Sequence, residues 1–135
     1  MSEPTPGGYR FFDFTVLVRD LDPQAHMANH VYVAYLSEAR ARFMRELVIP
    51  DGHLMPSVVA EVRCRYLSSL LPREEFRVGV RVERVGRTSI GFGYEVVAGD
   101  RVVARGESVE VLVDAATRRP RPVSSELRAV LTAAA

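Results

Sequence analysis

The chain has 135 residues, of which 47% are hydrophobic and 26% charged, and its formal net charge is +1 at pH 7. This length suits one domain that buries a core without disulfides or structural metals, and the charge offers no excess positive field for nucleic acid or anionic membranes. The single cysteine, Cys64, excludes an intramolecular disulfide, and no run approaches the roughly 18 consecutive apolar residues of a membrane span.

The chain begins with a polar segment, MSEPTPGGYR, which has neither the charged nor the apolar region of a signal peptide. We therefore expect a cytoplasmic protein. The first predicted element follows, because Phe12, Phe14, Val16 and Val18 alternate with mostly polar residues. A period of two is typical of a half-buried strand.

Residues 30–48 are predicted to form a long helix. A helix of this length rises roughly 28 Å, enough to cross a small sheet. The segment IPDG at 49–52 supplies proline and glycine as a stop signal. The apolar side chains recur at helical spacing and form one stripe, at Tyr32, Leu36, Ala39, Phe43 and Leu47.

Four further strands are predicted after the helix, each with alternating apolar residues. The connections between them are short, and short connections join antiparallel neighbours because a parallel crossover needs many more residues. Gly99 in the segment AGDR is expected to supply the positive φ of a tight turn. The predicted strands cover residues 58–66, 76–82, 90–96 and 102–108.

A short helix is predicted near the end of the chain, in the segment SSELRAVL, with Ser124 or Ser125 as its N-cap. The element order therefore predicts an α+β domain in which a long helix covers one face of a five-stranded antiparallel sheet. The alternation also predicts that the other face is partly polar. Edge strands of such a sheet must be paired or protected, and dimerisation through an edge is one solution.

The densest polar chemistry lies between Asp20 and His30, where the first strand leads into the long helix. His26 and His30 are spaced as two metal ligands on one helical face would be, and Asp20 or Asp22 could complete the set. The helical pattern begins only near Asn29, however, and no second cluster of cysteine or histidine follows. A metal site is therefore disfavoured.

An acid/base site is the alternative for this segment. Asp22 precedes Asn29 by seven residues, and the first backbone N–H groups of a helix point outward. The carboxylate could activate water, or attack directly, at a carbonyl carbon whose oxygen the N–H groups and helix dipole stabilise. Glu38 flanks the apolar stripe and is a second candidate carboxylate. The competing interpretation, which spacing by itself favours, makes Asp20 and Asp22 turn residues and Asn29 an N-cap.

The run DLDPQAHMANHVYVAYLSEAR, residues 20–40, resembles the signature D-x-D-x-x-G-H-V-N-N-x-x-Y-x-x-Y-x-E-x-A-R of hot-dog-fold acyl-CoA thioesterases of the 4-hydroxybenzoyl-CoA thioesterase type. The predicted element order matches that fold, a long helix wrapped by an antiparallel sheet. Residues 55–96 are similar to the family's second to fourth strands, so the resemblance covers nearly the whole chain. It implies a single hot-dog thioesterase-like domain over residues 1–135.

Among the differences from this signature, Ala25 replaces the glycine and Ala28 replaces the first asparagine, and His30 follows Asn29. The first departure concerns the backbone, because a Cβ at position 25 disfavours a positive φ that glycine would allow. None of the three removes Asp22 or the helix start.

The resemblance also implies roles for individual residues. In such enzymes the second aspartate of the D-x-D pair is the catalytic carboxylate, which here is Asp22. The N–H that polarises the thioester carbonyl falls on Asn29, whose side chain is a candidate for orienting water, and Arg87 matches a position that binds coenzyme A phosphates. Together with Arg87, the expected substrate-binding residues are His26, Tyr32 and Val58. Further candidates for shaping the cleft are Met27, Leu54 and Met55.

The function implied is that of an acyl-CoA thioesterase, which hydrolyses an acyl or aroyl thioester to a free acid and coenzyme A without a metal or redox cofactor. Asp22 would act as general base or as nucleophile. The family also implies a homodimer or homotetramer with active sites where two chains meet, and no nucleic-acid or membrane partner. Two alternatives remain: a non-catalytic acyl-CoA-binding module, and an enoyl-thioester hydratase with Asp22 and His26 as its acid/base pair.

Overall fold

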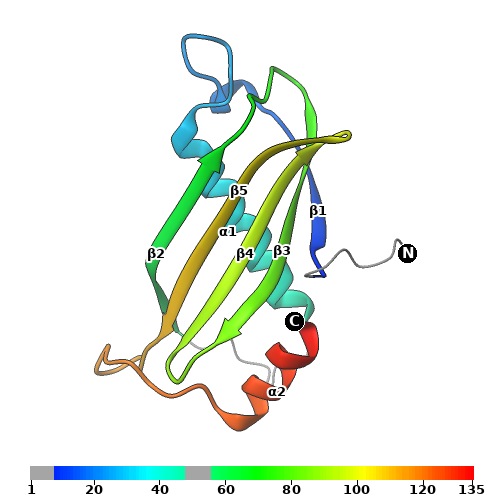
Figure 1. Ribbon diagram of the computed structural model, residues 1–135. Coiled ribbons are helices and arrows are strands. Elements are labelled where there is room, and N and C mark those ends of the chain that lie inside the picture. The colour runs from blue at the N-terminus through cyan, green and yellow to red at the C-terminus, as the bar shows by residue number, and fades with distance from the viewer. Residues whose placement is uncertain (1–7, 48–55) are drawn as a thin grey trace.

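The computed structural model describes residues 8–47 and 56–135. Its element order is strand, long helix, four strands and short helix, as the sequence predicted (Figure 1). A short 3-10 turn, η1, also precedes the long helix. The elements are β1 (Arg10–Thr15), η1 (Val18–Asp20), α1 (Asn29–Glu46), β2 (Ser57–Tyr66), β3 (Glu75–Val85), β4 (Ser89–Ala98), β5 (Arg101–Leu112) and α2 (Ser125–Ala134).

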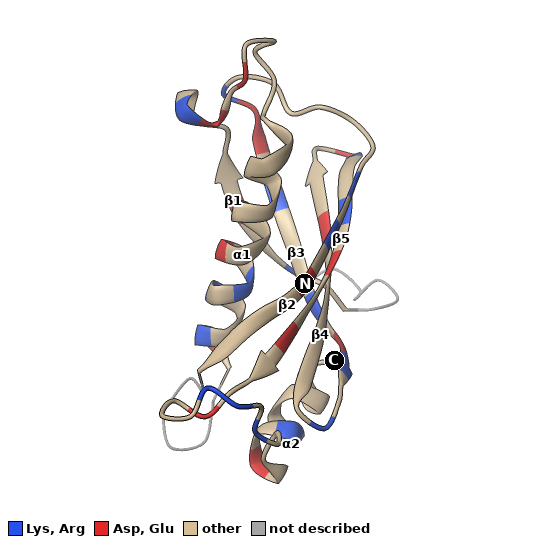
Figure 2. Ribbon diagram, turned by 90° about the vertical axis from the view of Figure 1, so that its left-hand side faces the viewer, with Lys and Arg blue, Asp and Glu red and all other residues tan. Residues whose placement is uncertain are grey.

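The strands form one antiparallel sheet in the order β1–β3–β4–β5–β2. Helix α1 crosses one face of this sheet, and Figure 2 shows it lying to one side of the twisted strands, with the β2 edge nearest the viewer. The predicted α+β architecture is therefore confirmed. Gly99 has a φ of 62° in the turn between β4 and β5, also as predicted.

The core lies between α1 and the sheet. The buried side chains of the helix are Tyr32, Leu36, Ala39 and Phe43, which are the first four members of the predicted stripe. These helix side chains pack against a continuous apolar layer of strand side chains. Strands β3 and β4 lie in the middle of the sheet and contribute most of this layer. The largest fully buried side chains of this layer are Tyr94, Phe92, Val78, Val80, Val96 and Val103.

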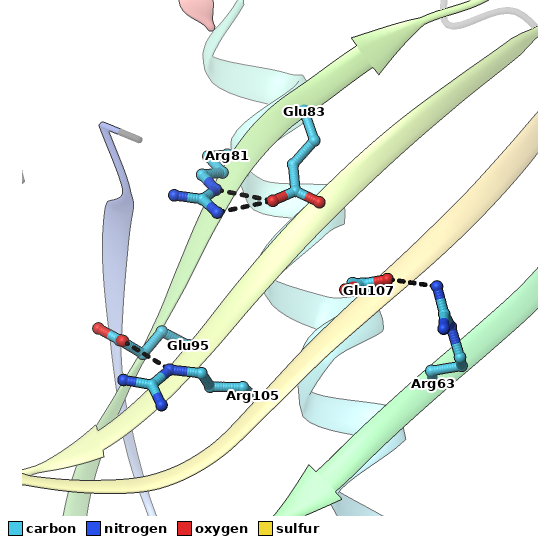
Figure 3. A network of polar contacts seen from close by, with 6 residues as sticks. All are labelled: Arg63, Arg81, Glu83, Glu95, Arg105 and Glu107. Carbon is cyan, nitrogen blue, oxygen red and sulfur yellow. Dashed lines mark hydrogen bonds and ion pairs between the residues drawn. The ribbon is translucent and has the colours of Figure 1, made fainter. Parts of the chain in front are cut away.

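The face of the sheet away from α1 is partly polar, as the alternation of the strands predicted. Three ion pairs span it: Arg63–Glu107 at 2.6 Å, Arg81–Glu83 at 2.7 Å and Arg105–Glu95 at 3.3 Å (Figure 3). Two of these pairs join neighbouring strands, so they follow the cross-strand register of the sheet.

The first strand ends earlier than its apolar alternation suggested. Strand β1 stops at Thr15, and although Val16 is buried, Val18 is 82% exposed. The reason is a tight turn, in which the Asp20 N–H donates to the Leu17 carbonyl at 2.9 Å. Helix α1 begins at Asn29 and ends at Glu46, and the expected stop signal at 49–52 lies outside the described residues.

Ala25 has a φ of 60°, so the chain does adopt at this position the left-handed conformation that its Cβ disfavours. That conformation costs a non-glycine residue about 1–2 kcal/mol. A glycine at position 25 would avoid this cost, but the unfolded chain would gain conformational entropy, which cancels part of the stabilisation. We therefore expect Ala25→Gly to raise the free energy of unfolding by about 0.5–1 kcal/mol in urea titrations. Ala34→Gly on the exposed side of α1 is the control and should lower it by about 1 kcal/mol. A loss of stability in both variants would contradict the strain assigned to Ala25.

Candidate active site

The segment between η1 and α1 folds back on itself like a narrow hairpin. The Ala28 N–H donates to the Asp20 carbonyl at 2.9 Å, and the Asp22 N–H donates to the His26 carbonyl at 2.9 Å. Asp22 therefore lies near the tip of this loop, and the first turn of α1 follows its base. The whole loop lies at one end of the molecule, beyond the helix (Figure 1).

The Asp22 carboxylate is oriented by its own turn. Its Oδ1 atom accepts hydrogen bonds from the Gln24 N–H at 2.8 Å and from the His26 N–H at 3.2 Å. Oδ1 thus has the role expected of a turn residue. Oδ2 accepts no hydrogen bond from the described residues and can contact a water molecule or a substrate.

Helix α1 has an open N-terminus. Its N-cap residue is Ala28, which has no side-chain acceptor, and its first turn contains no acidic residue. By contrast, the Ser124 hydroxyl caps α2 by accepting from the Leu127 N–H at 3.1 Å. Asn29 is therefore the first helical residue and not the cap, and the positive end of the α1 dipole faces an exposed surface beside the loop.

Two tyrosines hold the helix start and the loop in place. The Tyr66 hydroxyl donates to the Asn29 carbonyl at 2.7 Å, and its ring meets the Tyr32 ring edge-on at 5.0 Å. The Tyr32 hydroxyl accepts from the Leu70 N–H at 3.2 Å, and the Leu70 carbonyl in turn accepts from Met27. Tyr32 and Met27 are each only 2% exposed, so both belong to the core and support the loop from there through their contacts with Leu70.

The remaining predicted residues are not brought to the loop within one chain. Glu38 lies on α1 and pairs with Arg42 at 3.0 Å. Val58 is 41% exposed on the edge strand β2. Arg87 lies in the β3–β4 turn, which is at the end of the molecule opposite the loop (Figure 1). Leu54 and Met55 lie outside the described residues.

A buried polar network between α1 and the sheet was not predicted from the sequence. Arg40 forms an ion pair with Glu110, and their side chains are only 12% and 14% exposed. The guanidinium also donates to the Tyr94 hydroxyl at 3.0 Å, which lies 2.6 Å from the Ser108 hydroxyl. Burial raises the pKa of Tyr94, so this hydroxyl keeps its proton. The helical period placed Arg40 off the apolar stripe, and its partners come from strands that a local pattern cannot identify.

Beside this network lies a cavity of about 220 Å³ between α1, the sheet and α2. Apart from Arg40, Glu110 and two serines, its lining is apolar, so it can accept a small hydrophobic group. The lining side chains include Ala41, Met44, Ile90, Phe92, Leu112 and Leu127.

Over residues 8–47 and 56–135, no three histidine, cysteine, aspartate or glutamate side chains converge as metal ligands would. In the same part of the chain, no helix is both long and apolar enough to cross a membrane. The loop presents the Asp22 carboxylate and leads into the N–H groups of a helix start.

The sequence is similar to a known protein family over most of its length. A model of the thioesterase-like superfamily matches residues 16–131. The uncharacterized protein YsmA of Bacillus subtilis (strain 168) is 30% identical over 88 residues, which are 64% of this chain and only 60% of that protein.

Solved structures show the same fold. A thioesterase from Thermus thermophilus, complexed with coenzyme A and Zn, is 33% identical, with a TM-score of 0.81 and coverage of 91% of both chains. A predicted thioesterase from Bacillus stearothermophilus is 21% identical, with a TM-score of 0.84 and coverage of 93% of this chain and 96% of that one. The likeness extends over nearly the whole length of these two proteins.

Proposed function

Because this chain belongs to the thioesterase-like superfamily and has the hot-dog fold of its acyl-CoA thioesterases, we propose that it hydrolyses an acyl or aroyl thioester to a free acid and coenzyme A. The main structural support for this proposal is the geometry of the loop of residues 20–28. This loop orients the Asp22 carboxylate and leads directly into the uncapped N-terminus of α1.

In the proposed reaction, the Asn29 N–H donates a hydrogen bond to the thioester oxygen and stabilises the negative charge that develops there. Asp22 acts through Oδ2. As general base it takes a proton from water while the water oxygen bonds to the carbonyl carbon, and the C–S bond then breaks. As nucleophile it would instead form a mixed anhydride that water hydrolyses. In either case the coenzyme A thiolate leaves and is protonated.

Glu38 has no chemical step in this proposal, because its carboxylate already pairs with Arg42 and also lies 3.8 Å from Arg45. His26 is exposed on the loop next to the carboxylate that its N–H contacts, so it is a candidate for contacting the substrate. Tyr32 acts on binding indirectly, by holding Leu70 and through it the loop.

A homodimer through the β2 edge would bring the other predicted residues to the site. Strand β2 is the outer strand beside β5, and it exposes apolar side chains, with Val59 45% and Val62 36% exposed. Antiparallel pairing of two β2 strands places the beginning of one strand beside the end of the other. Val58 of one chain would then lie near Tyr66 and Asn29 of its partner, with the turn that holds Arg87 at the same end.

A charge at the middle of β2 is expected to separate the chains. The wild type should have the mass of a dimer or tetramer by light scattering, and Val62→Asp should shift it toward the monomer because two introduced carboxylates would meet across the edge. Acyl-CoA hydrolysis should fall in parallel. Glu61→Asp, which changes no charge on the same strand, is the control, and a monomeric wild type with full activity would refute the shared site.

Identifying the reaction products distinguishes thioester hydrolysis from the alternative activities. Saturated and α,β-unsaturated acyl-CoA thioesters are incubated with the protein and the products are identified by mass spectrometry. Hydrolysis gives free coenzyme A and free acid from both classes. Addition of water to the unsaturated thioester with the thioester intact would instead identify a hydratase, and stable binding without any product would identify a non-catalytic module.

A further inference from the structure

We propose that Asp20 and Tyr35 are positioning residues for this site: together they clamp the loop that carries Asp22 to the helix that begins at Asn29. The proposal rests on the proposed function for its catalytic consequence. The Asp20 side chain is buried, at 5% exposure, and its Oδ2 accepts from the Leu17 N–H at 2.9 Å and from the Tyr35 hydroxyl at 2.5 Å.

Asp20 joins three parts of the site at once. Its carboxylate holds the turn before the loop through Leu17 and the second turn of α1 through Tyr35. Its carbonyl accepts from the Ala28 N–H at 2.9 Å, which fixes the end of the loop. Asp22 follows Asp20 by two residues and Asn29 follows Ala28 directly. The two groups that act on the substrate are therefore each within two residues of an atom that Asp20 holds.

Tyr35 gives this clamp a rigid support. Its ring meets the rings of Phe14 and Phe76 edge-on, each at a centroid distance of 5.0 Å, so its hydroxyl is fixed by aromatic packing. Burial, the hydrogen bond to Asp20 and the charge of Asp20 raise the pKa of Tyr35 to about 12. The hydroxyl thus remains a donor to the carboxylate at every pH at which a thioesterase is assayed.

Removal of the Tyr35 hydroxyl tests the clamp without disturbing the aromatic packing. Tyr35→Phe should lower kcat for acyl-CoA hydrolysis by about tenfold or more and leave KM nearly unchanged, because small displacements of reacting groups are costly. Asp20→Ala should lower kcat by at least the same factor. Asp20→Asn should lower kcat less than Asp20→Ala does, because its amide oxygen still accepts both hydrogen bonds.

Tyr94→Phe is the matched control. It also deletes a buried tyrosine hydroxyl, which here contacts Arg40 and Ser108 on the sheet side of α1, remote from the loop. It should lower thermal stability and leave kcat unchanged. A role for Tyr35 in stability alone predicts instead that kcat is retained in both variants.

Amide hydrogen exchange provides a readout that does not depend on the reaction. In Tyr35→Phe, Asp20 still accepts from the N–H groups of Leu17 and Ala28, but the Tyr35 hydroxyl no longer holds it in place. Exchange should therefore accelerate at least about tenfold in residues 17–29 and stay unchanged in β4. Unchanged exchange in the loop overturns the clamp. If the wild type hydrolyses no acyl-CoA, the proposed function fails, and the exchange pattern still decides whether Asp20 and Tyr35 hold the loop.

Discussion

Asp22→Asn is expected to fold like the wild type, to bind acyl-CoA with similar affinity, and to release free thiol at least about 100-fold more slowly, the size of effect typical of a general base. The asparagine has the same shape, and its amide oxygen can accept from the Gln24 and His26 N–H groups as Oδ1 does in the wild type. The loop is therefore retained, and only the negative charge and basicity of Oδ2 are lost.

Asp114→Asn is the matched control for this substitution. The Asp114 carboxylate also caps a turn, because its Oδ1 accepts from the Ala116 and Thr117 N–H groups, both at 2.9 Å. It lies in the connection between β5 and α2, at the end of its own chain opposite the loop (Figure 1), and it has no step in the proposed reaction, so the control should keep kcat. Equal activity of Asp22→Asn and wild type, with both folded by circular dichroism, would remove Asp22 from the mechanism.

Glu110→Gln is expected to lower the free energy of unfolding by about 3 kcal/mol, because loss of one partner leaves a buried charge uncompensated. Arg40 would then remain charged between α1 and the sheet without the carboxylate that neutralises it. A double variant with both charges replaced by apolar side chains, Arg40→Met with Glu110→Leu, should recover most of this loss. The measurement is urea unfolding of the wild type, Glu110→Gln and the double variant.

The exposed pair Arg63–Glu107 provides the control for Glu110→Gln. Its side chains are 70% and 54% exposed, so Glu107→Gln should change stability by less than about 1 kcal/mol. If Glu110→Gln proved no more costly than Glu107→Gln, the network would not contribute to the packing of α1 on the sheet.

Local periodicity predicted most of the fold. The stripe from Tyr32 to Phe43 and the alternation in the strands identified α1 and the sheet, because the buried face of each element repeats along the sequence. The same signal failed at the end of β1. Val18 continues the alternation in the sequence but is exposed, because the Asp20 carboxylate and the turn around Leu17 redirect the chain.

The candidate site was less predictable, because several of its contacts join residues far apart in the sequence. The motif identified Asp22 and the helix start, both of which lie within one short loop. It did not indicate that Tyr35 supports Asp20 or that Tyr66 binds the Asn29 carbonyl. Val58 on β2 and Arg87 in the β3–β4 turn lie away from the loop of their own chain, so spacing within one sequence could not place them at a common site with Asp22.

Free-thiol release from a panel of short, long and aromatic acyl-CoA thioesters is the most direct test of the account. Wild type and Asp22→Asn are compared at equal concentration. The account predicts steady thiol release by the wild type from at least one class and its loss in the variant. Acyl-CoA that binds stoichiometrically to both proteins and stays intact would contradict hydrolysis and leave an acyl-CoA-binding module.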